Sequence, residues 1–257
     1  QVERILHICR ENEVPWFILG NGSNLLVSDR GFDGVIIQIY RNMSRIQVSG
    51  HHMTVQAGAL LSAVAKQALR EGLSGLEFAS GIPGTVGGAV VMNAGAYGGE
   101  MKDVVESVTV LDEEGAVRKL AREELQMGYR TSLVKKKGYT VLEAVLKLND
   151  GDPAAISARM EELKEQRVSK QPLEYPSAGS TFKRPEGYFA GKLIMDSGLR
   201  GFRVGGAQIS EKHCGFVINT GDATAEDVVR LIRQVQDIVY EKFHVKLEPE
   251  VRFLGIF

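Results

Sequence analysis

The sequence predicts an α+β protein made of two blocks, and three features of its 257 residues lead to that class. Segments with apolar residues at helical spacing are interspersed with short apolar or alternating segments that are typical of strands. A polar tract at residues 149–153 separates a strand-rich N-terminal block from a second block with its own helices and short strands. The hydrophobic fraction of 44% and the charged fraction of 25% are ordinary for a globular protein.

Helical periodicity and helix-end residues define the predicted helices. Gly72 ends the second helix, because glycine readily takes the left-handed conformation found just beyond a helix C-terminus. Thr224 begins the last helix with a weak capping box, since Asp227 is shorter than the preferred Glu. The predicted helices cover residues 2–12, 60–69, 154–168 and 189–197, followed by a long helix that begins at 224.

Short runs of β-branched and aliphatic residues between turn residues predict the strands. Pro249 confines the last strand to a sheet edge or end, because proline lacks a backbone N–H. On that strand Glu250 and Arg252 share one face, either as a site pair or as an ordinary surface ion pair. The predicted strands cover residues 16–19, 25–27, 35–39, 53–56, 104–111, 117–120, 140–148, 207–209, 216–219 and 245–254, with turns at 112–115 and 135–138.

Composition argues against several classes of function. The formal net charge of −1 provides no field to attract nucleic acid or an acidic membrane. No apolar run approaches the roughly 18 residues that span a bilayer, and no secretory signal is visible. Cys9 and Cys214 lie far apart and the histidines show no ligand spacing, so the sequence predicts no metal site and two buried thiols in a reducing compartment. The chain starts at Gln1 inside a predicted helix, and we expect an N-terminal segment to be missing from this numbering.

Glycine is the unusual component, with 29 residues, nine of them between Gly72 and Gly99. Each glycine inside regular structure destabilises the fold by about 0.5–1 kcal/mol relative to alanine. A cluster of glycines therefore indicates a local structural or functional requirement. The first tract, residues 20–25, follows an apolar strand, and its amides together with Ser23 and Asn24 are able to hold phosphate oxygens. A tight turn between strands explains the same residues. Leu25 breaks the Rossmann pattern, and residues 191–193 lack the hydroxyl of a P-loop, so both nucleotide motifs are excluded.

The second tract is a stronger signal for a nucleotide. Residues 78–99 contain no charged side chain, so a diphosphate there depends on backbone amides and on Ser80, Thr85 and Asn93. Such a site holds a buried dinucleotide without an ammonium group near its redox centre. The alternative is that the tract is a glycine-rich segment that packs between layers. The presence of two such tracts in one chain weakens this alternative. We therefore expect a diphosphate-bearing cofactor, FAD in the first place, on glycine-rich loops.

Two further segments carry candidate side chains. Arg130, between an aromatic residue and small hydroxyl residues at 128–132, suits a bidentate clamp on a carboxylate, or a surface salt bridge. The lysines at 135–137 are most simply a solvated turn. Ser180 lies in a small-residue loop at 177–185 with no G-x-S-x-G motif, so an esterase is rejected and a proton donor or an ordinary turn serine remains.

Six stretches together resemble the UDP-N-acetylenolpyruvoylglucosamine reductases of bacterial cell-wall synthesis. They occur in the family's order, cover nearly the whole chain, and are specific as a set although each is weak alone. The stretches are LGNGSNLLV (19–27), SGIPGTVGGAVVMNAGAYGGE (80–100), GYRTS (128–132), SAGSTFKRP (177–185), AGKLIMDSGLRG (190–201) and LEPEVRFLG (247–255). The short tail after Glu250 is similar to the family's shorter, second type.

The resemblance implies a two-part FAD-binding domain of the vanillyl-alcohol oxidase/PCMH type plus a smaller α+β substrate domain. It implies FAD-binding segments at 1–45 and at 46–155 joined by 250–257, and a substrate-binding segment at 156–249. The catalytic residues implied are Arg130, Ser180 and Glu250. The cofactor-binding residues implied are Gly20, Asn21, Gly22, Ser23, Asn24, Leu25, Gly58, Ser80, Gly81, Ile82, Pro83, Thr85, Val86, Gly87, Gly88, Ala89, Asn93, Gly95 and Ala96. The substrate-binding residues implied are Tyr97, Arg167, Lys170, Lys183, Arg184 and Arg252, with Arg184 standing where some members carry Asn.

The resemblance also implies a chemistry for these residues. NADPH reduces non-covalent FAD, which then delivers hydride to the enolpyruvyl ether of a UDP-sugar in the cytoplasm, yielding UDP-N-acetylmuramate. Arg130 stabilises the developing negative charge, Ser180 donates the proton, and Glu250 is protonated or orients its neighbours. A monomer is favoured, with no nucleic-acid partner and no membrane insertion. The alternatives are an FAD-dependent oxidase of a sugar or lactone on the same fold and a non-enzymatic nucleotide sensor.

Overall fold

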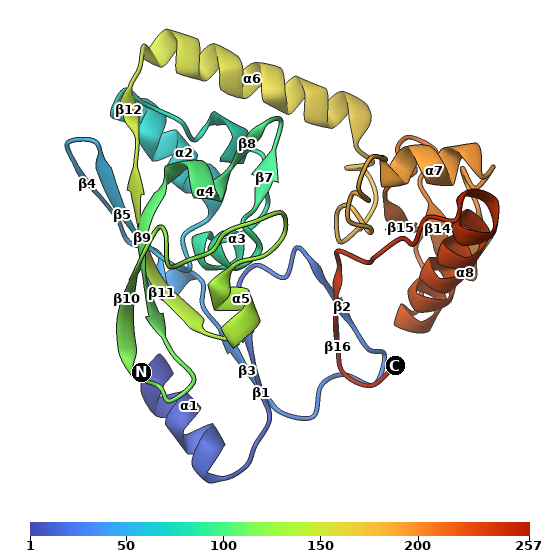
Figure 1. Ribbon diagram of the computed structural model, residues 1–257, viewed down its shortest axis with the longest axis horizontal. Helices are drawn as coiled ribbons and strands as arrows, with labels where there is room; N and C mark the ends of the chain where they lie inside the picture. The colour runs from blue at the N-terminus through green and yellow to red at the C-terminus, as the bar shows by residue number, and fades with distance from the viewer. The chain divides into compact units, whose positions relative to one another are not determined.

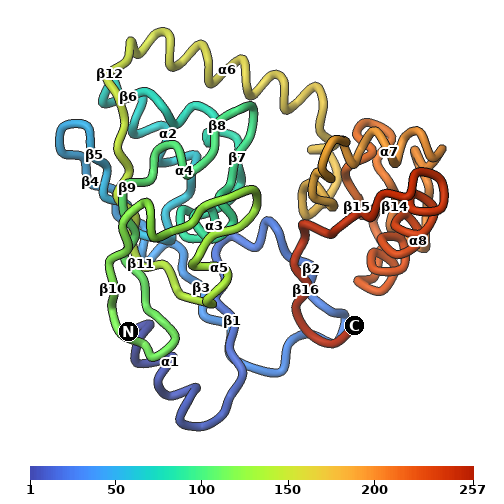
Figure 2. Tube along the Cα trace, viewed as in Figure 1, coloured from blue at the N-terminus to red at the C-terminus, as the bar shows by residue number.

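The chain forms two compact units in a computed structural model that describes residues 1–257 (Figure 1). Unit 1 comprises residues 1–22 and 34–166, and unit 2 comprises residues 23–33 and 167–257. The segment 23–33 therefore leaves unit 1 and returns to it, as the continuous trace in Figure 2 allows the reader to follow. These units divide the chain differently from the three segments expected from the sequence, whose boundaries stay a prediction.

Unit 1 is built on a five-stranded antiparallel sheet with strand order β10-β9-β11-β5-β4. The strands are β4 (Ile46–Ser49), β5 (His52–Gln56), β9 (Val105–Leu111), β10 (Val117–Ala121) and β11 (Thr140–Lys147). The helices α2 (Leu61–Arg70) and α3 (Val86–Met92) pack against this sheet, where Met53, Val64 and Val90 are fully buried. The predicted strands of this sheet are confirmed, and β4 is an additional strand whose half-buried Ile46 and Val48 alternate with exposed polar residues.

The N-terminal elements of unit 1 form a smaller layer. The strands β1 (Trp16–Leu19) and β3 (Val35–Gln38) pair in parallel, and α1 (Val2–Glu11) packs on them through buried Leu6. Leu6 contacts Ile37 of β3 and Leu111 of β9 in one small cluster, which joins this layer to the main sheet. The first predicted helix and its following strands are confirmed.

Unit 2 has its own core. Its antiparallel sheet consists of β13 (Arg203–Val204), β14 (Ala207–Ile209) and β15 (Val217–Asn219), covered by α7 (Ala190–Asp196) and α8 (Ala225–Phe243). The strand β2 (Leu25–Val27) pairs in parallel with β16 (Arg252–Leu254), so the segment 23–33 is held by the C-terminus of the chain. The predicted α+β class is confirmed in both units.

The long helix α6 (Pro153–Lys170) and several short elements complete the fold. The short elements are the helices α4 (Met101–Val104) and α5 (Leu133–Lys137), and the strands β6 (Leu73–Ser74), β7 (Gly95–Ala96), β8 (Gly99–Glu100) and β12 (Asn149–Asp150). α6 belongs to unit 1 up to Gln166, and its last turn belongs to unit 2. No helix combines the length and the apolar character required to cross a bilayer.

Three local expectations were wrong. The lysine run at 135–137 lies in α5 and not in a solvated turn, because Ser132 caps the helix and Gly138 ends it at φ +67°. The second glycine tract contains α3, whose ends are marked by the Thr85 cap and by Asn93 at φ 44°. The last strand covers only Arg252–Leu254, so the argument that places Glu250 and Arg252 on one face of a regular strand does not apply.

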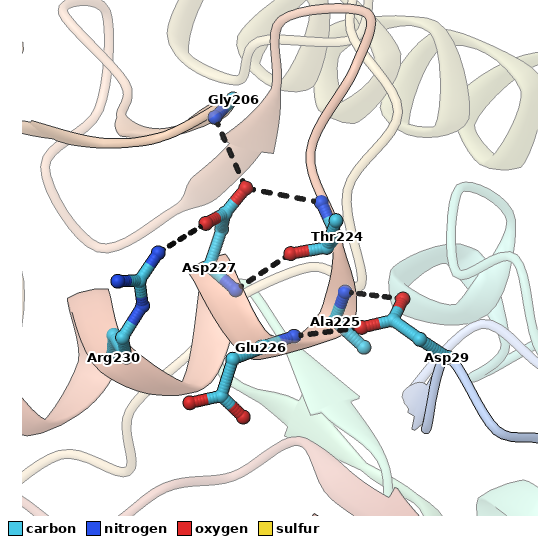
Figure 3. Close-up of polar contacts among 7 residues, drawn as sticks. All are labelled: Asp29, Gly206, Thr224, Ala225, Glu226, Asp227 and Arg230. Atoms are coloured by element: carbon cyan, nitrogen blue, oxygen red, sulfur yellow. Dashed lines mark hydrogen bonds and ion pairs between the residues drawn. The ribbon is translucent and has the colours of Figure 1, made fainter.

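The first turn of α8 is capped from two directions (Figure 3). Thr224 Oγ1 accepts from the Asp227 amide at 3.0 Å and Asp227 Oδ2 accepts from the Thr224 amide at 3.2 Å, which confirms the predicted capping box. The carboxylate of Asp29 accepts from the amides of Ala225 at 2.8 Å and Glu226 at 3.1 Å. Asp29 therefore fastens the segment 23–33 to a helix that lies almost 200 residues away in the sequence.

Candidate functional site

The two glycine tracts meet in unit 1. Asn21 Nδ2 donates to the Pro83 carbonyl oxygen at 2.6 Å. A Cβ atom on Gly20 would lie 2.5 Å from Thr85 Oγ1, a distance that real Cβ contacts do not reach, so this close approach requires glycine. Residues 20–22 and 83–85 therefore form one junction, which neither tract predicts by itself.

The amides at the start of α3 are already used by the protein. Those of Val86 and Gly87 each donate at 2.8 Å, to the carbonyl oxygens of Ala59 and Ala57 respectively. The Gly88 amide donates to Thr85 Oγ1 at 3.4 Å, so Thr85 acts as the helix cap. A diphosphate at this junction therefore depends on the amides that precede α3 and on those of the first tract, and not on the free N-terminus of a helix.

The side-chain donors expected at the cofactor also have protein partners. Ser80 Oγ donates to the Glu77 carbonyl oxygen at 2.8 Å, and Asn24 Nδ2 donates to the Glu250 carbonyl oxygen at 3.2 Å. Gly58 has a packing role, because a Cβ atom there would lie 2.1 Å from the Tyr40 carbonyl oxygen. The remaining implied cofactor residues lie in the two tracts, and their contacts with FAD stay a prediction. They are Gly22, Ser23, Leu25, Gly81, Ile82, Ala89, Gly95 and Ala96.

Asn93 is fully buried and uses all its hydrogen-bonding groups within unit 1. Its Nδ2 donates to Glu100 Oε2 at 2.5 Å and to the Gly128 carbonyl oxygen at 3.0 Å. Its Oδ1 accepts from the Lys102 amide at 2.8 Å. Since a primary amide has two N–H donors and one oxygen, this side chain is committed to joining neighbouring segments.

Arg130 lies at the tip of a tight turn. Gly128 and Thr131 exchange two backbone hydrogen bonds at 3.0 and 3.2 Å, and Arg130 between them has φ +54°. Its guanidinium donates to the Gly95 carbonyl oxygen at 3.4 Å and lies 4.9 Å from the ring centroid of Tyr129. A non-glycine residue in this left-handed region is strained, and such strain is concentrated at functional sites.

Tyr97 lies at the tip of a second tight turn in unit 1. The strands β7 and β8 pair Ala96 with Gly99, which leaves only Tyr97 and Gly98 in the loop. Both loop residues have positive φ, 53° and 90°. This is the geometry of a type I′ hairpin, in which a tyrosine at the first position is unusual.

Unit 2 brings Ser180 and Glu250 together on neighbouring extended segments. Ser180 pairs with Phe216, and the next residue, Thr181, donates its amide to the Gly215 carbonyl oxygen at 2.8 Å. On the other side the Glu250 amide donates to the Thr181 carbonyl oxygen, also at 2.8 Å. The segment that carries Ser180 is therefore held between two others, one of which carries Glu250.

The first glycine tract reaches the same part of unit 2. Besides the contact of Asn24 Nδ2 with the Glu250 carbonyl oxygen, the Arg252 amide donates to the Asn24 carbonyl oxygen at 3.1 Å. These bonds continue the ladder in which β2 pairs with β16. Asn24 therefore fixes the backbone on both sides of Val251.

The predicted substrate residues are distributed over both units. Lys183 pairs with Glu248, with Nζ 2.6 Å from Oε1. The guanidinium of Arg184 stacks on Phe189, 3.9 Å from the ring centroid, and Phe189 is 62% exposed. Arg167 and Lys170 lie at the end of α6, and Tyr97 belongs to unit 1. Within unit 2 the structure thus groups the cations at 183–184 with the Ser180 segment.

His213 and Cys214 adjoin this group but have the properties of packed residues. His213 is an exposed residue, but partial burial of its imidazole lowers the pKa of the ring, and burial raises the pKa of the Cys214 thiol. The Gly215 amide donates to His213 Nδ1 at 3.0 Å. The structure contains no cluster of three His, Cys, Asp or Glu side chains that could hold a metal ion.

Sequence reasoning missed two acidic residues, Glu100 and Asp29. Glu100 begins α4 with a capping box to Asp103, but glutamate is not among the preferred N-cap residues, so no local signal in the sequence marks it. No local pattern indicates the role of Asp29, because its helix partners are distant in sequence.

Comparison with known proteins gives a consistent result for both units. The sequence profile of an FAD binding domain matches residues 1–121, and that of the UDP-N-acetylenolpyruvoylglucosamine reductase C-terminal domain matches residues 171–254. The UDP-N-acetylenolpyruvoylglucosamine reductase of Clostridium perfringens SM101 is 57% identical over 255 residues, covering 99% of this chain and 84% of the relative. The protein of that name from Clostridioides difficile 630 is 51% identical, with the same coverage. The crystal structure of the Thermus caldophilus reductase superimposes with a TM-score of 0.84 at 41% identity, covering 96% of this chain and 88% of that one.

Proposed function

This chain belongs to the UDP-N-acetylenolpyruvoylglucosamine reductase family, and we propose that it reduces UDP-N-acetylglucosamine enolpyruvate to UDP-N-acetylmuramate with FAD as cofactor and NADPH as cosubstrate. The observation that carries the proposal is the junction of the two glycine tracts, in a chain that also sets Ser180 beside Glu250. The first feature suits a diphosphate cofactor, and the second suits proton transfer to a substrate. The reaction belongs to peptidoglycan synthesis, and we expect a cytoplasmic monomer.

The FAD diphosphate is held by main-chain amides at the junction. The amides of Gly81, Gly84 and Thr85 precede those that α3 engages, and together with the amides at 21–24 they supply the donors. The side chains of Asn21, Asn24 and Thr85 shape the loops through their protein bonds. A close approach by phosphate is possible because these tracts are rich in glycine, which has no Cβ atom, and contain no charged side chain.

When bound, FAD would supply the hydride that reduces the enolpyruvyl double bond. Arg130 suits the stabilisation of the negative charge that would develop toward the substrate carboxylate, because a guanidinium is a planar cation with several N–H donors. Ser180 of unit 2 donates its Oγ proton to the adjacent carbon as general acid. Glu250 is either protonated itself or orients Ser180, since an ionised carboxylate would repel the intermediate.

Substrate recognition involves cations on the segment that follows Ser180 in unit 2. Lys183 and Arg184 lie on the segment that follows Ser180, where they suit the diphosphate of the UDP group. Exposed Phe189, under the Arg184 guanidinium, offers an aromatic surface near these cations. Arg167, Lys170, Tyr97 and Arg252 complete the expected set.

The visible absorption spectrum of the purified protein tests this function. We expect a flavin spectrum that bleaches on adding NADPH and returns on adding UDP-N-acetylglucosamine enolpyruvate without oxygen. A protein that binds no flavin contradicts the proposal. A flavin that is reduced by a sugar or lactone and not by NADPH indicates an oxidase instead. FAD should be released on denaturation, because residues 16–40 contain no His or Cys for covalent attachment.

A further inference from the structure

We propose that Glu100 is a positioning residue for Arg130, acting through the buried side chain of Asn93. The inference rests on the proposed role of Arg130 and assigns a function to a carboxylate that the reaction itself does not require. Glu100 ends β8, only three residues after the tip of the Tyr97 hairpin. Its side chain is linked to the turn that contains Arg130 through one other side chain, that of Asn93.

The contacts that link the two residues are short and internal to unit 1. Glu100 Oε2 accepts from Asn93 Nδ2 at 2.5 Å, and the second N–H of the same amide reaches the Gly128 carbonyl oxygen at 3.0 Å. Gly128 is the first residue of the turn that presents Arg130. Because Asn93 has no solvent exposure, it cannot replace either acceptor with bulk water without opening the core.

The turn needs such support because its conformation is strained. Arg130 has φ +54° and Asn93 has φ 44°, and the Asn93 side chain bonds to Gly128, the first residue of the turn that contains Arg130. Left-handed backbone at a residue with a Cβ atom persists only where surrounding contacts over-determine it. Two other bonds hold the far side of the turn, from Ser132 Oγ to the Val91 carbonyl oxygen at 2.8 Å and from Lys135 Nζ to the Arg130 carbonyl oxygen at 3.0 Å.

Glu100 also fixes the other end of the Arg130 side chain. The guanidinium donates to the Gly95 carbonyl oxygen, and Gly95 is the strand partner of Glu100 across β7 and β8. A Cβ atom on Gly95 would lie 2.7 Å from Glu100 Cβ, so the two backbones are in close contact. Lys102 pairs with Glu100, and this hydrogen bond and charge raise the pKa of Lys102. The two carboxylate oxygens of Glu100 are therefore divided between Lys102, which contacts Oε1, and Asn93, which contacts Oε2.

The experiment compares the two half-reactions in Glu100→Ala and Glu100→Gln, with Glu106→Ala as the matched control. Glu106 is a half-exposed carboxylate of the same unit that contacts only His52 through its side chain. In Glu100→Ala we expect FAD content and the rate of flavin reduction by NADPH to be retained. Reoxidation by the enolpyruvyl substrate should slow by about 10- to 100-fold, the loss typical of a misplaced catalytic group. Glu100→Gln keeps an oxygen acceptor for Asn93 and should recover most of the rate, and Glu106→Ala should match the parent protein.

A double-mutant cycle with Arg130→Ala separates positioning from general loss of structure. If Glu100 acts through Arg130, adding Glu100→Ala to Arg130→Ala should cause no further slowing of reoxidation. Fully additive effects, or equal slowing of both half-reactions in Glu100→Ala, overturn the inference while leaving the proposed function intact. Unchanged reoxidation in Arg130→Ala itself would overturn the proposed role of Arg130, an outcome that Glu100 variants alone cannot produce.

Discussion

Arg130 in unit 1 and Glu250 in unit 2 are held by different kinds of backbone. Of the six non-glycine residues with positive φ, five lie in unit 1, and four of these fall between residues 93 and 130. Unit 2 contains only His244, which ends α8. Ser180 and Glu250 instead lie on extended segments joined by main-chain hydrogen bonds.

The difference indicates that the two units hold their candidate catalytic residues in place by different means. A strained turn fixes one cation in one place, and it requires a buried polar network to maintain it. A ladder of main-chain bonds tolerates changes in side chains, because its bonds do not depend on them. Substitutions of the Ser180 and Glu250 side chains should therefore affect chemistry selectively, whereas those around Arg130 should also change stability.

The largest effect is expected for Ser180→Ala. Its backbone pairing with Phe216 does not involve the hydroxyl, so the fold and FAD content should be retained. Reoxidation by the enolpyruvyl substrate should slow by about 10²- to 10⁴-fold, the usual contribution of a general acid, while flavin reduction by NADPH is unchanged. Stopped-flow absorbance measures both steps, with Ser177→Ala as the control from the same loop. Equal slowing of both steps would remove Ser180 from the role of proton donor.

A smaller effect, a difference in the free energy of unfolding, should distinguish two substitutions of Arg130. Both Arg130→Ala and Arg130→Gly remove the guanidinium, but only glycine relieves the left-handed conformation at φ +54°. The glycine variant should be more stable than the alanine variant by about 1 kcal/mol in urea unfolding. Equal free energies of unfolding would show that the turn is not strained, and the contrast between the units would lose its physical basis.

Removing the cap that Asp29 provides tests whether the stability of unit 2 depends on the segment 23–33. Asp29→Ala leaves the amides of Ala225 and Glu226 without their acceptor and should destabilise the protein by about 1 kcal/mol. FAD affinity should also weaken, because β2 then holds Asn24 less firmly against Glu250. The control is Asp33→Ala in the same segment. A variant with parental stability and FAD affinity would show that the ladder with β16 is sufficient by itself.

The smallest effect is a pH dependence from Asp227. The hydrogen bond from Arg230, followed by those from the amides of Thr224 and Gly206, lowers its pKa from 3.8 to about 2. Because the folded pKa is depressed, the contribution of this carboxylate to stability is complete above pH 3.8 and is lost as the pH falls through about 2. Between pH 5 and pH 2, the midpoint temperature of thermal unfolding should fall more steeply for the parent protein than for Asp227→Asn. Parallel curves would contradict this assignment.

Sequence reasoning succeeded where local signals and packing agree. The helix at 225–243 has a capping box and an apolar stripe, and both are found in the structure. The amphipathic α2 ends next to Gly72 as expected. Strands rich in β-branched residues, such as β9, were also located within a residue of their ends.

Other elements depend on tertiary contacts that overrule local preference. Gly87 and Gly88 disfavour helix, yet α3 forms because Thr85 caps it and Gly87 fits against Ala57, where a Cβ atom would come within 3.0 Å. The segment before β16 is not a strand because its pairing with residues 181–183 is limited to the isolated bridge of Phe182 with Pro249, and Pro249 has no N–H to extend it. The candidate residues could be identified from the sequence, but the junction of the tracts and the Glu100–Asn93 link could not, since both are contacts between distant segments.

A crystal structure of the FAD complex is the most direct test of the central claim that main-chain amides bind the cofactor. We predict diphosphate oxygens about 2.7–3.2 Å from amide nitrogens at residues 21–24 and 81–85, with no lysine or arginine side chain on the diphosphate. A diphosphate held by basic side chains, or a cofactor bound away from these two glycine tracts, would contradict the account.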